Sequence, residues 1–146
     1  MNRRKLMVLG VAGLASTAWA NSKVFTGRFS NLGLSGYDPV GYFVSDQPVE
    51  GSAKHQAEWA GVDYRFANQA NRDAFLADPE RYLPAYGGFC AYAVANGYTA
   101  SADPEAWTVV DGRLYLNYNK SVRTRWLKDV PGHIEKANQN WPGLAN

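Results

Sequence analysis

The pattern of apolar and polar positions along the chain predicts two β-hairpins. In residues 54–67, aromatic and β-branched side chains alternate with polar ones on both sides of a break at residues 60–61, as in a strand, a turn and a second strand. Residues 107–116 show the same alternation around Asp111-Gly112, a pair that accepts the positive φ angles of a tight hairpin turn. We therefore expect two antiparallel hairpins.

Helical spacing marks the segments that follow the hairpins. Asn68 can cap a helix that ends near Ala77, because its side chain accepts a hydrogen bond from a free N–H group of the first turn. A short helical turn is expected at residues 78–83. After the second hairpin, residues 121–128 and a last segment opened by Pro131 place apolar residues along one stripe, which predicts two more helices.

The stretch YLPAYGGFCAYAVANG at residues 82–97 predicts the central helix. It carries no charge, and residues 89–95 are all apolar or small, which is typical of a helix that is buried on every side. Asn96-Gly97 supplies a left-handed stop. We expect this helix, over residues 87–96, to be the most buried element. The predicted fold class is α+β: a single small domain of antiparallel β-hairpins packed with short helices around a buried central helix, without an internal repeat.

The first twenty residues have a different pattern. A basic head at residues 2–5, an apolar run at residues 6–15 and a small-x-small site at residues 18–20 together predict an export signal peptide. The apolar run is shorter than the roughly 20 residues that a membrane-spanning helix needs. Arg3-Arg4 resembles a twin-arginine signal, and ordinary secretion is the alternative. Either route predicts a periplasmic protein with no membrane span after signal removal.

Removing residues 1–20 changes the charge of the chain. The full sequence of 146 residues has 15 basic and 13 acidic residues. Three of the basic residues and none of the acidic ones lie in the signal, so the mature net charge is about −1. This balance does not favour a nucleic-acid partner. The length fits one domain, and we expect an extended lead-in at residues 21–33 before a domain at residues 34–142.

The side chains that could bind a soft metal are few. Cys90 is the only cysteine and cannot form an internal disulfide, and both methionines lie in the signal. With His55 and His133 as the only histidines, four-ligand Cys/His zinc sites, cysteine-ligated iron–sulfur clusters and methionine-rich copper sites are excluded. A metal site would combine Cys90, His55 and an oxygen donor such as Asp38, or use a second chain, and would be weak.

Each of these candidates also has a purely structural interpretation. Cys90 is expected at about the third position of the central helix, where free N–H groups stabilise a thiolate, but it equally suits packing as a small hydrophobe. Asp38 precedes Pro39 and suits either a turn or one hard ligand. His55 and His133 have no partner at metal-ligand spacing and suit surface or capping positions.

Tyrosines gather around the same segments and could serve either of two purposes. They are Tyr37, Tyr42, Tyr82, Tyr86, Tyr92, Tyr98, Tyr115 and Tyr118. One hypothesis is a pocket beside Cys90, and the other is a core of buried rings whose hydroxyl groups find polar partners. No catalytic spacing of Ser, His and Asp or of Cys, His and Asn is recognisable. We therefore expect no catalytic residues.

Four motifs together resemble the exported bacterial YHS domain-containing proteins. They are GYDPVGYF at residues 36–43, YRF at residues 64–66, NRDAFLADPERYLPAYGGFCAYAVANG at residues 71–97 and DPEAWTVVDGRLYLNYNKSV at residues 103–122. The resemblance runs from about Leu34 to Pro142. Cysteines that broader YHS domains carry are replaced here, by Gly41, Ala67 and Asn71.

The resemblance implies a periplasmic binding module. Its ligand would be a metal ion, with copper as the guess at family level, or a small molecule near Cys90. Because the usual thiols are missing, a metal ion would bind here by a different route from that of the broader family. The alternatives are a thiol-dependent or metal-dependent redox accessory enzyme, and a structural partner domain of another envelope protein.

Overall fold

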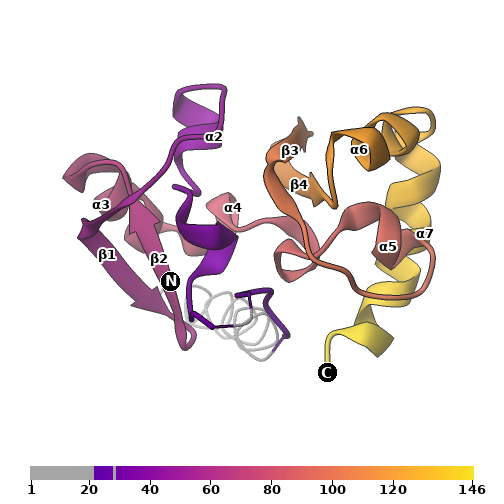
Figure 1. Ribbon diagram of the computed structural model, residues 1–146, viewed down its shortest axis with the longest axis horizontal. Helices are drawn as coiled ribbons and strands as arrows, with labels where there is room; N and C mark the ends of the chain where they lie inside the picture. Colours follow the sequence, from indigo (N-terminus) through magenta and orange to yellow (C-terminus); the bar gives the residue numbers. More distant parts are fainter. Residues whose placement is uncertain (1–21, 28) are drawn as a thin grey trace, which may run out of the picture.

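The computed structural model describes residues 22–27 and 29–146, and the predicted signal peptide lies outside this part. Two antiparallel hairpins, each a separate two-stranded sheet, combine with short helices in one small domain (Figure 1), which confirms the predicted α+β class. Within the described residues no helix is long and apolar enough to cross a membrane.

The elements in chain order are η1 (Gly33–Gly36), α2 (Gly41–Val44), β1 (Ser52–Trp59), β2 (Val62–Phe66), α3 (Gln69–Ala77), α4 (Pro79–Tyr82), η2 (Ala85–Gly88), α5 (Ala91–Ala95), β3 (Asp103–Val110), β4 (Arg113–Asn117), α6 (Lys120–Leu127) and α7 (Val130–Leu144).

Both hairpin turns lie where the sequence pattern predicts them. Ala60 and Gly61 have φ angles of 53° and 82°, and Asp111 and Gly112 have φ angles of 50° and 78°. Positive φ angles strain residues with a side chain, so glycine suits the second position of each turn. The two hairpin predictions are confirmed.

The helices that follow the hairpins begin at asparagine caps. The backbone N–H of Asn71 donates to Asn68 Oδ1 at 2.8 Å, and that of Val122 donates to Asn119 Oδ1 at 2.8 Å. Each bond satisfies an N–H group that has no partner within its helix. The predicted segments for α3, α4 and α6 agree with the structure to within about one residue, and α7 begins one residue before Pro131.

The central helix is shorter than the sequence predicts. A helix over residues 87–96 is expected, but α5 has only five residues. Tyr86 and Gly87 have φ angles of 58° and 62°, which cannot continue a right-handed helix. η1 makes the same turn, with φ angles of 56° and 53° at Leu34 and Ser35. The lead-in packs on the second of these turns, where Phe25 donates its N–H to the carbonyl oxygen of Gly87 at 2.9 Å. A Cβ atom at Gly87 would also collide with the backbone of the lead-in.

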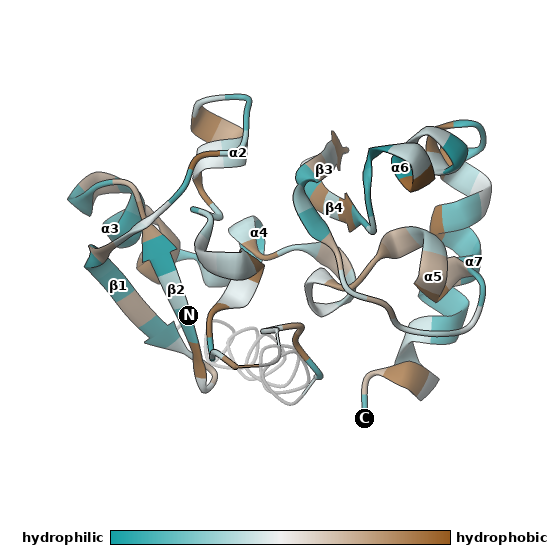
Figure 2. Cartoon of the chain, viewed as in Figure 1, coloured by the Kyte–Doolittle hydropathy of each residue, from teal (hydrophilic) through white to brown (hydrophobic). Residues whose placement is uncertain are grey.

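α5 is nevertheless the buried centre of the second half of the domain, which runs from η2 to α7. Ala91 and Val94 are fully buried in it, and Figure 2 colours α5 towards the hydrophobic end of its scale. The surrounding cluster draws on η2, β4, α6 and α7 and contains Ala85, Tyr86, Ala91, Val94, Ala95, Tyr115, Trp126 and Ala137. The predicted arrangement of short helices and hairpins around a buried helix is therefore confirmed.

Two further clusters complete the core. One belongs to the first hairpin and the helices beside it, and contains Val40, Ala57, Val62, Tyr64, Phe66, Phe75 and Leu83. The other joins the two halves, since Leu34 and Tyr42 pack against Leu114 and Leu116 of β4. The hydroxyl of Tyr42 donates to the carbonyl oxygen of Pro104 at 2.8 Å. The first half is therefore attached directly to the second hairpin.

The structure contains an internal repeat that the sequence pattern did not reveal. β1, β2 and the start of α3 recur 51 residues later as β3, β4 and the start of α6. Both hairpins shift register at the same place, between Ser52 and Gln56 in the first and between Asp103 and Trp107 in the second. The expectation of no repeat is wrong, because the two units agree more closely in backbone geometry than in sequence.

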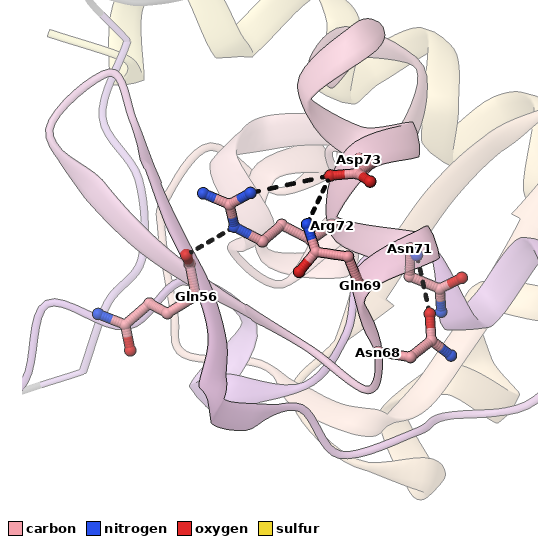
Figure 3. A network of polar contacts seen from close by, with 6 residues as sticks. All are labelled: Gln56, Asn68, Gln69, Asn71, Arg72 and Asp73. Atoms are coloured by element: carbon pink, nitrogen blue, oxygen red, sulfur yellow. Dashed lines mark hydrogen bonds and ion pairs between the residues drawn. The ribbon is translucent and has the colours of Figure 1, made fainter.

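Side-chain contacts recur in the two units as well. Arg72 donates from Nε to the carbonyl oxygen of Gln56 at 3.0 Å (Figure 3), and Arg123 donates from Nε to that of Trp107 at 2.6 Å. A sparse shared pattern begins at the two capping asparagines: Arg four residues later, an aromatic residue and Leu seven and eight residues later, and Asp ten residues later. This pattern is the sequence signal that identifies the repeat.

Replacing Ala91 by leucine should overpack the core around α5. Ala91 is 0% exposed, so the larger side chain has to displace its neighbours, at an expected cost of about 1–3 kcal/mol in the free energy of unfolding. Ala70→Leu, at an exposed position of α3, is the control and should unfold like the wild type. Urea unfolding followed by tryptophan fluorescence measures both. An Ala91→Leu curve that overlays the wild-type curve would place the core elsewhere.

Candidate functional site

Cys90 lies in the turn that leads into α5, as the N-cap residue. The expected third helical position is wrong, because the helix begins only after Cys90. The residue is 2% exposed. Its Sγ accepts the backbone N–H of Tyr118 at 3.2 Å, and its thiol faces Oδ1 of Asn117 at 3.6 Å. The polar contacts of the thiol therefore come from the end of the second hairpin and not from the start of the helix.

Asn117 connects this turn to the end of β4. Its side chain is fully buried, and Oδ1 accepts the backbone N–H of Tyr92 at 3.0 Å in addition to facing Cys90. Among the described residues Nδ2 of Asn117 has no hydrogen-bond partner. Buried amides usually satisfy both their oxygen and their nitrogen, so the unpartnered Nδ2 of Asn117 is an exception.

Asp38 is a turn-forming residue with a saturated carboxylate. It is 0% exposed. Oδ1 accepts the backbone N–H groups of Val40 at 2.8 Å and Gly41 at 3.3 Å. Oδ2 accepts the backbone N–H of Ala67 at 2.9 Å and Nδ2 of Asn71 at 2.7 Å. With four donors on two oxygens, the carboxylate has little capacity left for a metal ion.

The histidines lie apart from these two residues. His55 is on β1, and its Nδ1 is buried without a hydrogen-bond partner among the described residues. The ring of His133 lies 5.2 Å from the ring of Tyr92. In residues 22–27 and 29–146, no three His, Cys, Asp or Glu side chains are grouped so that they could hold a metal ion. Cys90, His55 and Asp38 are therefore not gathered into one ligand set, and weak metal binding at any one of them stays a prediction.

Cys90 and Asp38 occupy equivalent positions of the repeat. The backbone N–H of Asp38 donates to the carbonyl oxygen of Val49 at 2.8 Å, and that of Cys90 donates to that of Ala100 at 2.9 Å. Each side chain also accepts an N–H from the residue that follows the second strand of its own hairpin. The thiol of the second unit thus replaces the carboxylate of the first.

A cavity opens beside Cys90. It has an empty volume of about 480 Å³, part of it open to solvent. Its lining comes from α5, the loop after α5, the end of the second hairpin and α6, and consists of Cys90, Tyr92, Ala93, Tyr98, Ala100, Tyr118, Val122 and Arg125. Among these residues Arg125 is the only charged one. Tyr98 and Tyr118 are each 53% exposed, so their rings are accessible to a ligand from solvent.

The tyrosines divide between the two hypotheses. Tyr42 and Tyr86 belong to the buried core, and burial raises the pKa of each hydroxyl well above its ordinary value. They remain protonated donors at neutral pH, as the bond from Tyr86 to Oδ1 of Asn138 at 3.0 Å requires. Tyr92, Tyr98 and Tyr118 line the cavity instead. Both uses that the sequence suggested therefore occur, in different tyrosines.

Sequence reasoning identified Cys90 but missed three residues that shape its cavity. Ala100, Val122 and Arg125 all line it. They come from a loop and from α6, and only the tertiary fold brings them to the thiol. Comparison of the two units of the repeat would have drawn attention to them, because each differs in size or charge from its counterpart in the first unit.

Removing the carboxylate of Asp38 should destabilise the fold more than removing the thiol of Cys90. Asp38→Ala leaves several buried donors without an acceptor, with an expected loss of about 3 kcal/mol in the free energy of unfolding. Cys90→Ala removes one weak sulfur acceptor and little volume, so its loss should be clearly smaller. Urea unfolding of the two variants beside the wild type measures the difference. Equal losses would contradict the assignment of Asp38 as the stronger structural residue.

Comparison with known proteins does not identify a function for this site. No protein-family model, curated protein or solved structure matches the chain. The resemblance to YHS domain-containing proteins accordingly stays a prediction from the motifs. The structure has a cavity beside a buried thiol, bordered by three tyrosines and one arginine.

Proposed function

We propose that the mature chain is a periplasmic binding module of the YHS type that holds a small molecule in the cavity beside Cys90. The observation that carries this proposal is the cavity itself, with accessible aromatic rings, one cation and a thiol. Small-molecule sites in proteins are typically concave, mostly apolar and equipped with a few polar groups. The export signal and the four sequence motifs support the location and the family.

A small molecule fits this site better than a metal ion does. Cys90 offers one sulfur ligand, whereas its neighbour Asn117 is already committed to the N–H of Tyr92. Tyrosine rings and an arginine are poor partners for copper, which favours thiolate, thioether and imidazole ligands. Copper bound through Cys90 would need donors from a second chain, and it is retained as the alternative ligand.

One contact favours a second candidate, a thiol-dependent redox accessory role. The N–H of Tyr118 points at Sγ of Cys90 from 3.2 Å and would stabilise a thiolate once one forms. The low exposure of Cys90 limits access to this sulfur. The two roles differ in their dependence on the thiol, because a redox role requires it and a binding role does not.

Filling the cavity tests the binding role. Ala100→Phe places a ring in the space that a ligand would occupy, so a small organic species that co-purifies with the wild type should be lost. Ala77→Phe, at an exposed position at the end of α3, is the control and should retain it. Native mass spectrometry with elemental analysis of protein exported by its own signal provides the measurement. A species that survives in Ala100→Phe would contradict the proposed site, and a metal lost only in Cys90→Ser would support the copper alternative.

The export route is tested separately at the arginine pair. Replacing Arg3 and Arg4 by lysine should block twin-arginine export, because that pathway reads the pair. The precursor should then accumulate in the cytoplasm, whereas the wild type yields a periplasmic protein that begins at or near Asn21. Cell fractionation and N-terminal sequencing measure both, with Lys5→Arg as the control for charge. Unaltered export of the double variant would show that general secretion is the route.

A further inference from the structure

The first unit of the repeat shows what a closed version of the Cys90 site looks like. Asn71, on α3, places its amide on the carboxylate of Asp38 at 2.7 Å. Val49 packs tightly against the turn, since a Cβ atom at Gly41 would lie 3.0 Å from the Cβ of Val49. Side chains of the unit itself therefore occupy the space around Asp38.

In the second unit, both of these positions hold side chains that end closer to the backbone. Val122 corresponds to Asn71, because the N–H of each donates to the asparagine that caps its helix. Ala100 corresponds to Val49, because each accepts an N–H from Asp38 or Cys90. Val122 cannot donate a hydrogen bond to the thiol, and Ala100 lacks two methyl groups. The cavity beside Cys90 thus lies where the first unit has its own side chains.

At the border of the cavity, two side chains of the second unit are larger than their counterparts in the first unit. Tyr118 stands where the first unit has Ala67, since both follow the last strand residue and donate to the equivalent acceptor. Arg125 lies three residues after Val122 on α6, where α3 has Ala74. Two small side chains are thus replaced by an aromatic ring and a guanidinium group, both of which line the cavity.

The chemistry of these groups selects a class of ligand. The guanidinium of Arg125 makes no hydrogen bond or ion pair with another described residue, and no acidic side chain lines the cavity among the residues that the structure describes. Arginine binds carboxylates through two parallel hydrogen bonds. The accessible tyrosine rings favour contact with a flat group.

We infer that the ligand is a small planar organic anion, such as an aromatic carboxylate, with its charge on Arg125 and its flat part against the tyrosines. This inference rests on the proposed function and adds the ligand class. It assigns Arg125 as the residue that selects charge and Val122 as the residue that keeps the cavity open. The thiol of Cys90 forms part of the wall and is not required for charge selection.

Benzoate and its uncharged analogue benzamide are the probes. Amide NMR titrations of the signal-free chain, followed at Tyr118 and at the residues of α6, should show benzoate binding about tenfold more tightly than benzamide. Arg125→Gln should abolish this preference by weakening benzoate alone. Lys128→Gln removes a charge at the end of the same helix, away from the lining, and should leave the preference unchanged.

Closing the cavity provides the second arm. Val122→Asn should weaken both probes about tenfold or more, because an amide at this position can occupy the space as Asn71 does in the first unit. Ala100→Leu, which fills the opposite side, should do the same if Val122→Asn fails to fold.

The outcomes separate this inference from the proposed function. Equal binding of both probes, lost in Val122→Asn, would overturn the anion preference and leave the cavity as a binding site. A benzoate preference that persists in Arg125→Gln would overturn the role of Arg125. The absence of amide shifts at the cavity with either probe at millimolar concentration would overturn the ligand class, and the test of co-purified species in Ala100→Phe would then decide the proposed function independently.

Discussion

A hydrogen bond from the backbone N–H that follows a hairpin to a buried side chain recurs in both units, and the bond to the carboxylate of Asp38 is the contact on which the fold depends most. Ala67 makes it to Asp38, and Tyr118 makes it to Cys90. Backbone N–H groups away from water need a partner, and a missing partner is costly. Because the acceptor lies in the turn before a helix, this bond sets where α2 or α5 meets the end of its hairpin.

The two acceptors differ in strength, and this difference explains why the units differ in shape. A carboxylate accepts several charge-assisted hydrogen bonds, whereas a thiol is a weak acceptor. Asp38 therefore serves Val40, Ala67 and Asn71 together. In the second unit Asn117 accepts the N–H of Tyr92 and leaves the sulfur with the bond from Tyr118. Less polar structure is gathered around Cys90, and space remains for a cavity.

Because of this difference between Asp38 and Cys90, the two halves of the domain differ in structure. The first half is closed by its own side chains and holds the second hairpin through Tyr42, whose hydroxyl bonds to Pro104. In the second half, α5 and α6 both contribute residues to the lining of the cavity and to a buried cluster shared with α7. Lining residues that belong to packed helices suit small-molecule recognition, because ordering the site on binding would reduce affinity. The proposed binding role follows from this asymmetry.

The sequence by itself determined the elements whose signals are local. Asp111-Gly112 specifies a tight turn through its own backbone preferences, and Asn68 specifies a helix start through a bond three residues away. Only the tertiary structure decided the rest. The N-terminal part of the central helix is replaced by a turn with positive φ angles at Tyr86 and Gly87, on which the distant lead-in packs. The cavity exists because Arg125 and Val122 are brought to Cys90 from another helix. Contacts between segments far apart in the chain leave no periodic pattern in either segment, so sequence alone could name the thiol but not its surroundings.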